Sequence, residues 1–161
     1  MAMPILSVVK RMAKSAEVRI AARPDKRFKK PKVSWLKEDM ERLGEEIAEE
    51  FKNTVTENIE ENKYGFENAE STIKRKGSDT PLIDTGELVG AIYRDGTTVS
   101  VEDSPRSDSS LTNLELAIVQ EYGTKDKHIP ARPVWRETFK DFKEVAEGKI
   151  ADFLETHKFN E

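Results

Sequence analysis

The sequence predicts an α+β domain in which a long N-terminal helix and a C-terminal helix pack on a small, mainly antiparallel sheet, with short helices between. Two long stretches carry apolar residues every three or four positions, as one face of a helix requires. Between them, 93–101 holds β-branched residues on one side of an Asp-Gly pair, which is typical of a hairpin. Helical stretches that flank a short strand pair favour this fold class.

The first predicted helix begins with Ser34, whose hydroxyl can cap the unpaired N–H groups of the first turn. We expect it to end between Asn62 and Gly65. Its apolar stripe comprises Leu36, Met40, Leu43, Ile47, Phe51, Val55 and Ile59. This stripe extends over about seven turns, so it needs another element against it.

The last predicted helix follows Ile129-Pro130-Ala131-Arg132-Pro133, and Pro133 suits the first helical position. Its apolar stripe comprises Trp135, Phe139, Phe142, Ala146, Ile150 and Phe153. At this spacing Trp135 is interpreted as a core residue.

Shorter elements are predicted between the two long helices. We expect a loop over 66–80, which contains the basic run Lys74-Arg75-Lys76. Asp84 and Glu87 have the spacing of a capping box, with Leu88, Ala91 and Ile92 as the buried face of a short helix.

A hairpin should follow over 93–101, turning at Asp95-Gly96. After a Ser- and Asp-rich loop, Asn113 is expected to cap a second short helix that Gly123 ends with a positive φ.

The 161 residues suit one domain preceded by a basic arm. Residues 1–33 form the predicted arm and linker, and 34–161 the α+β domain. The arm has ten basic and two acidic residues, a net charge of +8; the rest has 17 basic and 29 acidic residues, a net charge of −12. Such an arm suits contact with nucleic acid or an acidic protein surface, although a solvated tail has the same composition. Its candidate contacts are Lys10, Arg11, Lys14, Arg23, Lys26, Arg27, Lys29 and Lys30.

Composition argues against several kinds of site. There are no cysteines and only two histidines, His128 and His157, which disfavours thiol chemistry and a zinc site. We expect no cofactor. No apolar run has the length of a membrane span, and the N-terminus does not have the charge order of a signal peptide, so a cytosolic origin is expected.

Asp84-Thr85-Gly86, preceded by Leu82 and Ile83, has two interpretations. It matches the local signature of an aspartic protease, which would need a dimer to bring two aspartates together. It also suits a turn that starts a helix. The absence of a recognisable Gly-rich flap and the helical pattern after Gly86 favour the turn.

Arg132, between two prolines, suits a bidentate anion contact, although pairing with a carboxylate such as Glu121 is the more ordinary role. His128 is expected to be a solvated loop residue.

Three segments in order resemble the neck and tail-completion proteins of tailed bacteriophages, also described as head–tail joining or virion morphogenesis proteins. They are Leu82-Ile83-Asp84-Thr85-Gly86-Glu87-Leu88, then Glu121-Tyr122-Gly123-Thr124, then Pro130-Ala131-Arg132-Pro133. The resemblance covers about 72–142 and leaves out the basic arm. Val134 departs from it, since the family usually has an aromatic residue or Met after the last proline.

The resemblance implies a structural, non-enzymatic virion protein at the head–tail junction. Similar proteins form homo-oligomeric rings, commonly hexamers, between connector or head-completion proteins and tail-tube or sheath proteins, and DNA passes through the lumen. The motif residues would then be structural: Leu82, Asp84, Thr85, Gly86, Leu88, Glu121, Tyr122, Gly123, Pro130, Arg132 and Pro133. A dimeric protease using Asp84, or a nucleic-acid binder using the arm, are the alternatives.

Overall fold

The computed structural model describes residues 3–4, 33–76, 81–83, 85–126 and 128–156. Asp84, His157 and the eight candidate contacts of the basic arm lie outside them. The elements in order are β1 (Met3–Pro4), α2 (Val33–Glu60), α3 (Glu70–Lys76), α4 (Glu87–Gly90), β2 (Ile92–Asp95), β3 (Thr98–Val101), α5 (Asn113–Tyr122) and α6 (Val134–Thr156). The predicted α+β class is confirmed.

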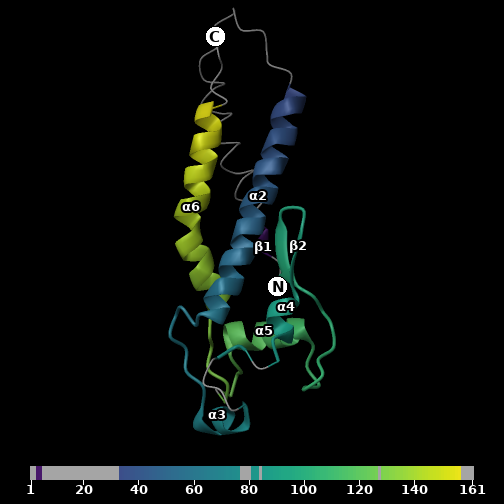
Figure 1. The fold of residues 1–161 in the computed structure, drawn as a ribbon, viewed down its shortest axis with the longest axis vertical. Coiled ribbons are helices and arrows are strands. Elements are labelled where there is room, and N and C mark those ends of the chain that lie inside the picture. Colours follow the sequence, from purple (N-terminus) through teal and green to yellow (C-terminus); the bar gives the residue numbers. More distant parts are fainter. Residues whose placement is uncertain (1–2, 5–32, 77–80, 84, 127, 157–161) are drawn as a thin grey trace, which may run out of the picture.

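Helices α2 and α6 lie side by side and give the molecule its length (Figure 1). The stripe predicted on α2 is buried at Ile47, Phe51, Val55 and Ile59. Phe51 is the centre of an aromatic cluster, with ring centroids 6.3, 6.1 and 5.4 Å from those of Trp135, Phe139 and Phe142. Dense packing of this kind makes truncation of a central aromatic residue cost about 3–5 kcal/mol.

A polar cluster also joins the two long helices. Asn58 Nδ2 donates to Thr138 Oγ1 at 2.9 Å, and both side chains are buried. Tyr64 extends the cluster outward by donating to Asp141 Oδ2 at 3.0 Å. A buried amide without a hydrogen-bond partner is costly. The Asn58–Thr138 bond therefore favours the position of α2 along α6 at which these two residues meet.

The sheet has the order β1-β3-β2, with both pairs antiparallel. Helix α2 contacts this hairpin on one side and α6 on another, so its stripe is shared between them. Val99 and Val101 of β3 are buried in the same core. Asp95 pairs with Thr98, so the turn is Gly96-Thr97 and not the predicted Asp95-Gly96. Gly96 has φ +55°, which a two-residue hairpin loop favours.

The remaining short elements gather at one end of the long helices, where α3, α4 and α5 lie near one another (Figure 1). The predicted loop over 66–80 is wrong in part, because Glu70–Lys76 forms α3 and the basic run lies on this helix. Its seven residues are too few to give a clear periodic pattern.

Helix boundaries differ from the predictions by a residue or two, as they often do. Helix α2 begins at Val33, so Ser34 lies in its first turn, and α6 begins at Val134, one residue after Pro133. Thr112, not Asn113, caps α5, with Glu115 completing the capping box. Asn113 is instead buried, and bonds Ser104 and Arg106.

Candidate functional site

Glu121, in the last turn of α5, caps the start of α6. Its side chain is fully buried. One carboxylate oxygen accepts from Trp135 N at 3.0 Å, and the other from Arg136 N at 3.2 Å and Arg136 Nε at 2.9 Å. Helix N-termini present unpaired N–H groups and favour negative charge. The suggested pairing of Arg132 with Glu121 is therefore wrong, because the Glu121 carboxylate accepts hydrogen bonds from Arg136 and from the α6 backbone.

Gly123 lets the chain turn closely after α5. It ends the helix with φ +71°, as predicted, and an added Cβ would lie 2.7 Å from Ile129 O and 2.9 Å from Ala131 N. Thr124 holds the same loop, since its N–H donates to Ile129 O at 3.0 Å and its hydroxyl accepts from Ile129 N at 3.1 Å. Only glycine fits this approach of backbone to backbone.

Arg132 joins this corner to the segment before α3. Its guanidinium donates to Gln120 Oε1 and to the Glu67 carbonyl, both at 2.7 Å, while its backbone N–H donates to Gln120 O at 2.6 Å. The residue is only 8% exposed. Burial lowers the pKa of the Arg132 guanidinium below its ordinary value, because removal from water penalises the charged form.

The described part of the Asp-Thr-Gly segment leads into a short helix. Gly86, with φ +82°, is the N-cap of α4, and the Thr85 hydroxyl accepts from Glu87 N at 3.4 Å. The reciprocal role predicted for Glu87 in a capping box is wrong, because Glu87 is the first helical residue and its carboxylate bonds Ser107; the part predicted for Asp84 lies outside the described residues. Leu88 is buried as predicted, whereas Leu82 is half-buried with φ +65°.

Glu87 contacts the loop that follows the hairpin. Its carboxylate accepts from the hydroxyl of Ser107 and from Ser107 N at 3.2 Å. These bonds, the hydroxyl first, lower the pKa of Glu87 below its usual value, since they stabilise the ionised form. Ala91 and Ile92 are buried as expected, but Ala91 caps the end of α4 and Ile92 belongs to β2.

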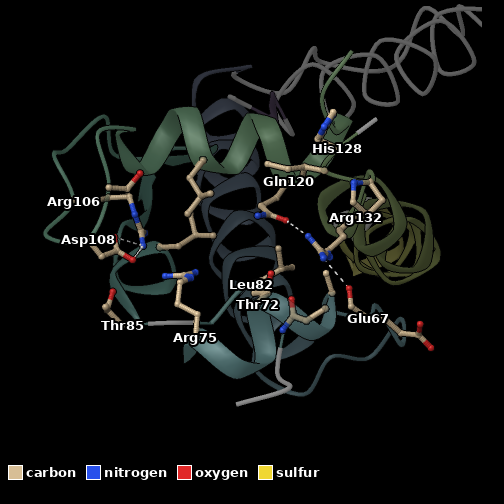
Figure 2. Close-up of a pocket in the computed structure, with 18 residues that line it drawn as sticks. Glu67, Thr72, Arg75, Leu82, Thr85, Arg106, Asp108, Gln120, His128 and Arg132 are labelled. Carbon is tan, nitrogen blue, oxygen red and sulfur yellow. Dashed lines mark hydrogen bonds and ion pairs between the residues drawn. The ribbon is translucent and has the colours of Figure 1, made fainter. Parts of the chain in front are cut away.

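Residues of the first and third motif segments, α3, α5 and the loop after the hairpin line one pocket of about 660 Å³, which we call the arginine-lined pocket. Its walls include Arg75, Arg106 and Arg132 with Leu82, Leu88 and Leu116. Figure 2 shows Arg106 and Asp108 on one side and Gln120, Arg132 and Glu67 on the other.

The two sides of this pocket differ in charge pairing. Arg106 forms an ion pair with Asp108 at 2.8 Å, and the Arg106 bond lowers the pKa of that carboxyl. Arg132 takes part in none of the ion pairs of the described residues. The Nε atoms of Arg106 and Arg132 are buried, and neither has a hydrogen-bond acceptor among the described residues.

The sequence pointed to Arg132 but missed Arg106 and Gln120. Arg106 lies in a loop rich in Ser and Asp, where an isolated arginine is ordinarily solvated, and no local pattern distinguishes it. Arg75 belongs to the basic run that was expected to lie in a loop; it is exposed and lines the pocket from α3.

The other predicted motif residues lie at the pocket rim or outside it. Pro130 and Thr85 are exposed and line it. Tyr122 is 58% exposed, and the Arg136 guanidinium lies 5.2 Å from its ring centroid. His128 is exposed as expected, with Nδ1 3.1 Å from Asp126 Oδ2.

Among the described residues, no three His, Cys, Asp or Glu side chains are placed to hold a metal ion. Over the same ranges, no helix combines the length and the apolar character that crossing a bilayer demands.

Comparison of the chain with protein families, with curated proteins and with solved structures finds no match. The geometry of the corner and the pocket is therefore the basis for any functional proposal.

Proposed function

We propose that this protein is a structural component of a tailed-phage virion, positioned at the head–tail junction. It would form a homo-oligomeric ring, such as a hexamer, between connector or head-completion proteins and tail-tube or sheath proteins. DNA would pass through the lumen of that ring. The protein performs no catalysis in this role.

The observation that carries the proposal is the use made of the motif residues. Glu121 caps α6, Gly123 permits the close turn, and Arg132 bonds α5 and the segment before α3. Side chains engaged in this way build a rigid corner, as expected if the resemblance reflects a shared scaffold rather than a shared reaction.

Two further features support assembly. Ile118 and Tyr122 lie four residues apart on α5 and are 42% and 58% exposed, so they present apolar surface on one helix face. The residues after the arm carry a net charge of −12. An acidic surface that faces a lumen would let DNA slide, because affinity for phosphates depends on the cations that a protein offers.

Native mass spectrometry and sedimentation of the full chain test the proposal directly. We expect a closed oligomer of fixed mass, alone or with connector proteins, and a strict monomer under both conditions would contradict it. Ile118→Glu should lower the mass by charging the α5 face. Val145→Glu adds the same charge at a 44% exposed position on α6 and should not.

A protease assay provides an independent check. Unfolded protein incubated with the chain at acid pH should stay intact. Cleavage that disappears in Asp84→Asn, with folding preserved, would refute the non-enzymatic role and favour the aspartic protease.

A further inference from the structure

Arg132 is a buried cation whose partners are neutral. An arginine has five N–H donors, and the described acceptors are one amide oxygen and one carbonyl oxygen. The Nε–H of Arg132 has no acceptor in this part of the chain. Buried charges are ordinarily paired, because desolvation without a counter-charge is costly. A site that leaves a guanidinium in this state is suited to an anion supplied from outside.

The surroundings of Arg132 indicate what kind of anion fits. The arginine-lined pocket adds Arg75 and Arg106, whereas Asp108 already compensates Arg106. Glu67, the other acidic residue on the described wall, is exposed and gives Arg132 its carbonyl oxygen. Among the described wall residues, Arg132 therefore has no carboxylate partner.

The rest of the wall is mixed, with polar side chains such as Thr72 and Ser109 beside apolar ones. Leu82, Leu88 and Leu116 line the pocket together with Ile129. Its volume of about 660 Å³ lies in the range of pockets that enclose small ligands, which combine apolar walls with a few fixed polar groups. A monoanion with an apolar group matches this wall better than a free, fully hydrated phosphate does.

We propose that the arginine-lined pocket is a binding site for a carboxylate that carries an apolar group, held by the Arg132 guanidinium. The carboxylate belongs either to a small acid or to a side chain of a neighbouring copy of this chain. The site itself does not depend on the head–tail role.

Calorimetric titration with hexanoate tests the site, with acetate and hexanol as probes that lack the apolar tail or the charge. Chloride keeps the ionic strength constant. Hexanoate should bind more tightly than either probe. Arg132→Gln should weaken hexanoate binding about tenfold or more, as the loss of a charge-assisted hydrogen bond predicts. Lys143→Gln, which makes the same charge change at an exposed position on α6, should not alter it.

If Arg132→Gln fails to fold, Arg75→Gln replaces it, since Arg75 is exposed on the pocket wall and its loss should still weaken hexanoate binding several-fold. Equal binding of hexanol and hexanoate would overturn the proposal. So would an affinity that is unchanged in these pocket variants, or an absence of binding to wild type at any protein concentration.

Sedimentation distinguishes the two sources. If a neighbouring copy supplies the carboxylate, hexanoate should dissociate the wild-type oligomer by competition. If a small acid is the ligand, hexanoate should bind without any change of mass. Both results support the site, and a ring that forms without hexanoate binding would refute the site while leaving the proposed function intact.

Discussion

Replacing Glu121 by Gln should destabilise the fold far more than its conservative chemistry suggests. One carboxylate oxygen becomes an NH2 group, which faces a backbone N–H of α6 instead of accepting from it. A hydrogen bond to a charged group contributes about 1.5–3 kcal/mol. The favourable interaction of negative charge with a partly buried helix start adds up to about 2 kcal/mol.

Two corrections reduce this sum. The bond to the Arg136 side chain counts for little, because that side chain is 51% exposed and screened by water. A neutral amide is also easier to bury than a carboxylate. We therefore expect Glu121→Gln to lower the free energy of unfolding by about 2–4 kcal/mol. For a chain of this size that corresponds to a Tm lower by roughly 5–15 °C.

Urea unfolding followed by circular dichroism measures this loss. The matched control is Glu137→Gln, which removes a charge from the first turn of α6, where the side chain forms an exposed pair with Lys140. The control should cost less than about 1 kcal/mol. A Glu121→Gln loss no larger than that of Glu137→Gln would refute the capping role.

Three further predictions concern single contacts. Gly123→Ala should cost about 2 kcal/mol or more in thermal unfolding, because the φ of this residue is positive and the new methyl group meets backbone atoms. The control Gly148→Ala, in open space on α6, should instead stabilise the fold by up to about 1 kcal/mol. Equal effects of the two substitutions would contradict the close approach at Gly123. Thr138→Val should cost about 1–3 kcal/mol in urea unfolding, because the buried Asn58 amide loses its shorter hydrogen bond and keeps only the 3.4 Å one to Tyr64 among the described residues. A neutral result would exclude a role for the Asn58–Thr138 bond. Ser107→Ala should raise the pKa of Glu87 toward its ordinary value in an NMR titration. In the wild type, the Ser107–Glu87 bond stabilises the fold above the unfolded-state pKa of Glu87, and this contribution is lost as pH falls through the lower folded-state pKa. An unchanged pKa of Glu87 in the variant would contradict the role of this bond.

The parts of the fold that follow from local periodicity could be predicted. The stripe of α2 and the position of Trp135 depend on helical spacing alone, which the chain carries over many turns. The hairpin was predictable because β-branched residues follow a glycine turn, although pairing moved that turn by one residue.

The errors arise where partners lie far apart in the chain. Glu87 has the spacing of a local cap, but Ser107, 20 residues later, takes its carboxylate. Glu121 could not be assigned to α6 before the loop between them was known to turn back at Gly123. The arginine-lined pocket likewise requires α3, α4, α5 and four loop segments to meet, and local sequence spacing does not predict contacts between segments so far apart.

The pairing of α2 with α6 has a consequence for how the chain folds. Asn58 and Thr138 are 80 residues apart, and Trp135, Phe139 and Phe142, whose rings contact Phe51, lie on α6. During synthesis, α2 leaves the ribosome long before the helix that covers its stripe. Contacts of such high sequence separation form slowly, and the apolar surface stays exposed meanwhile. The nascent chain should therefore depend on chaperone protection until α6 is complete, and truncation before α6 should yield aggregates.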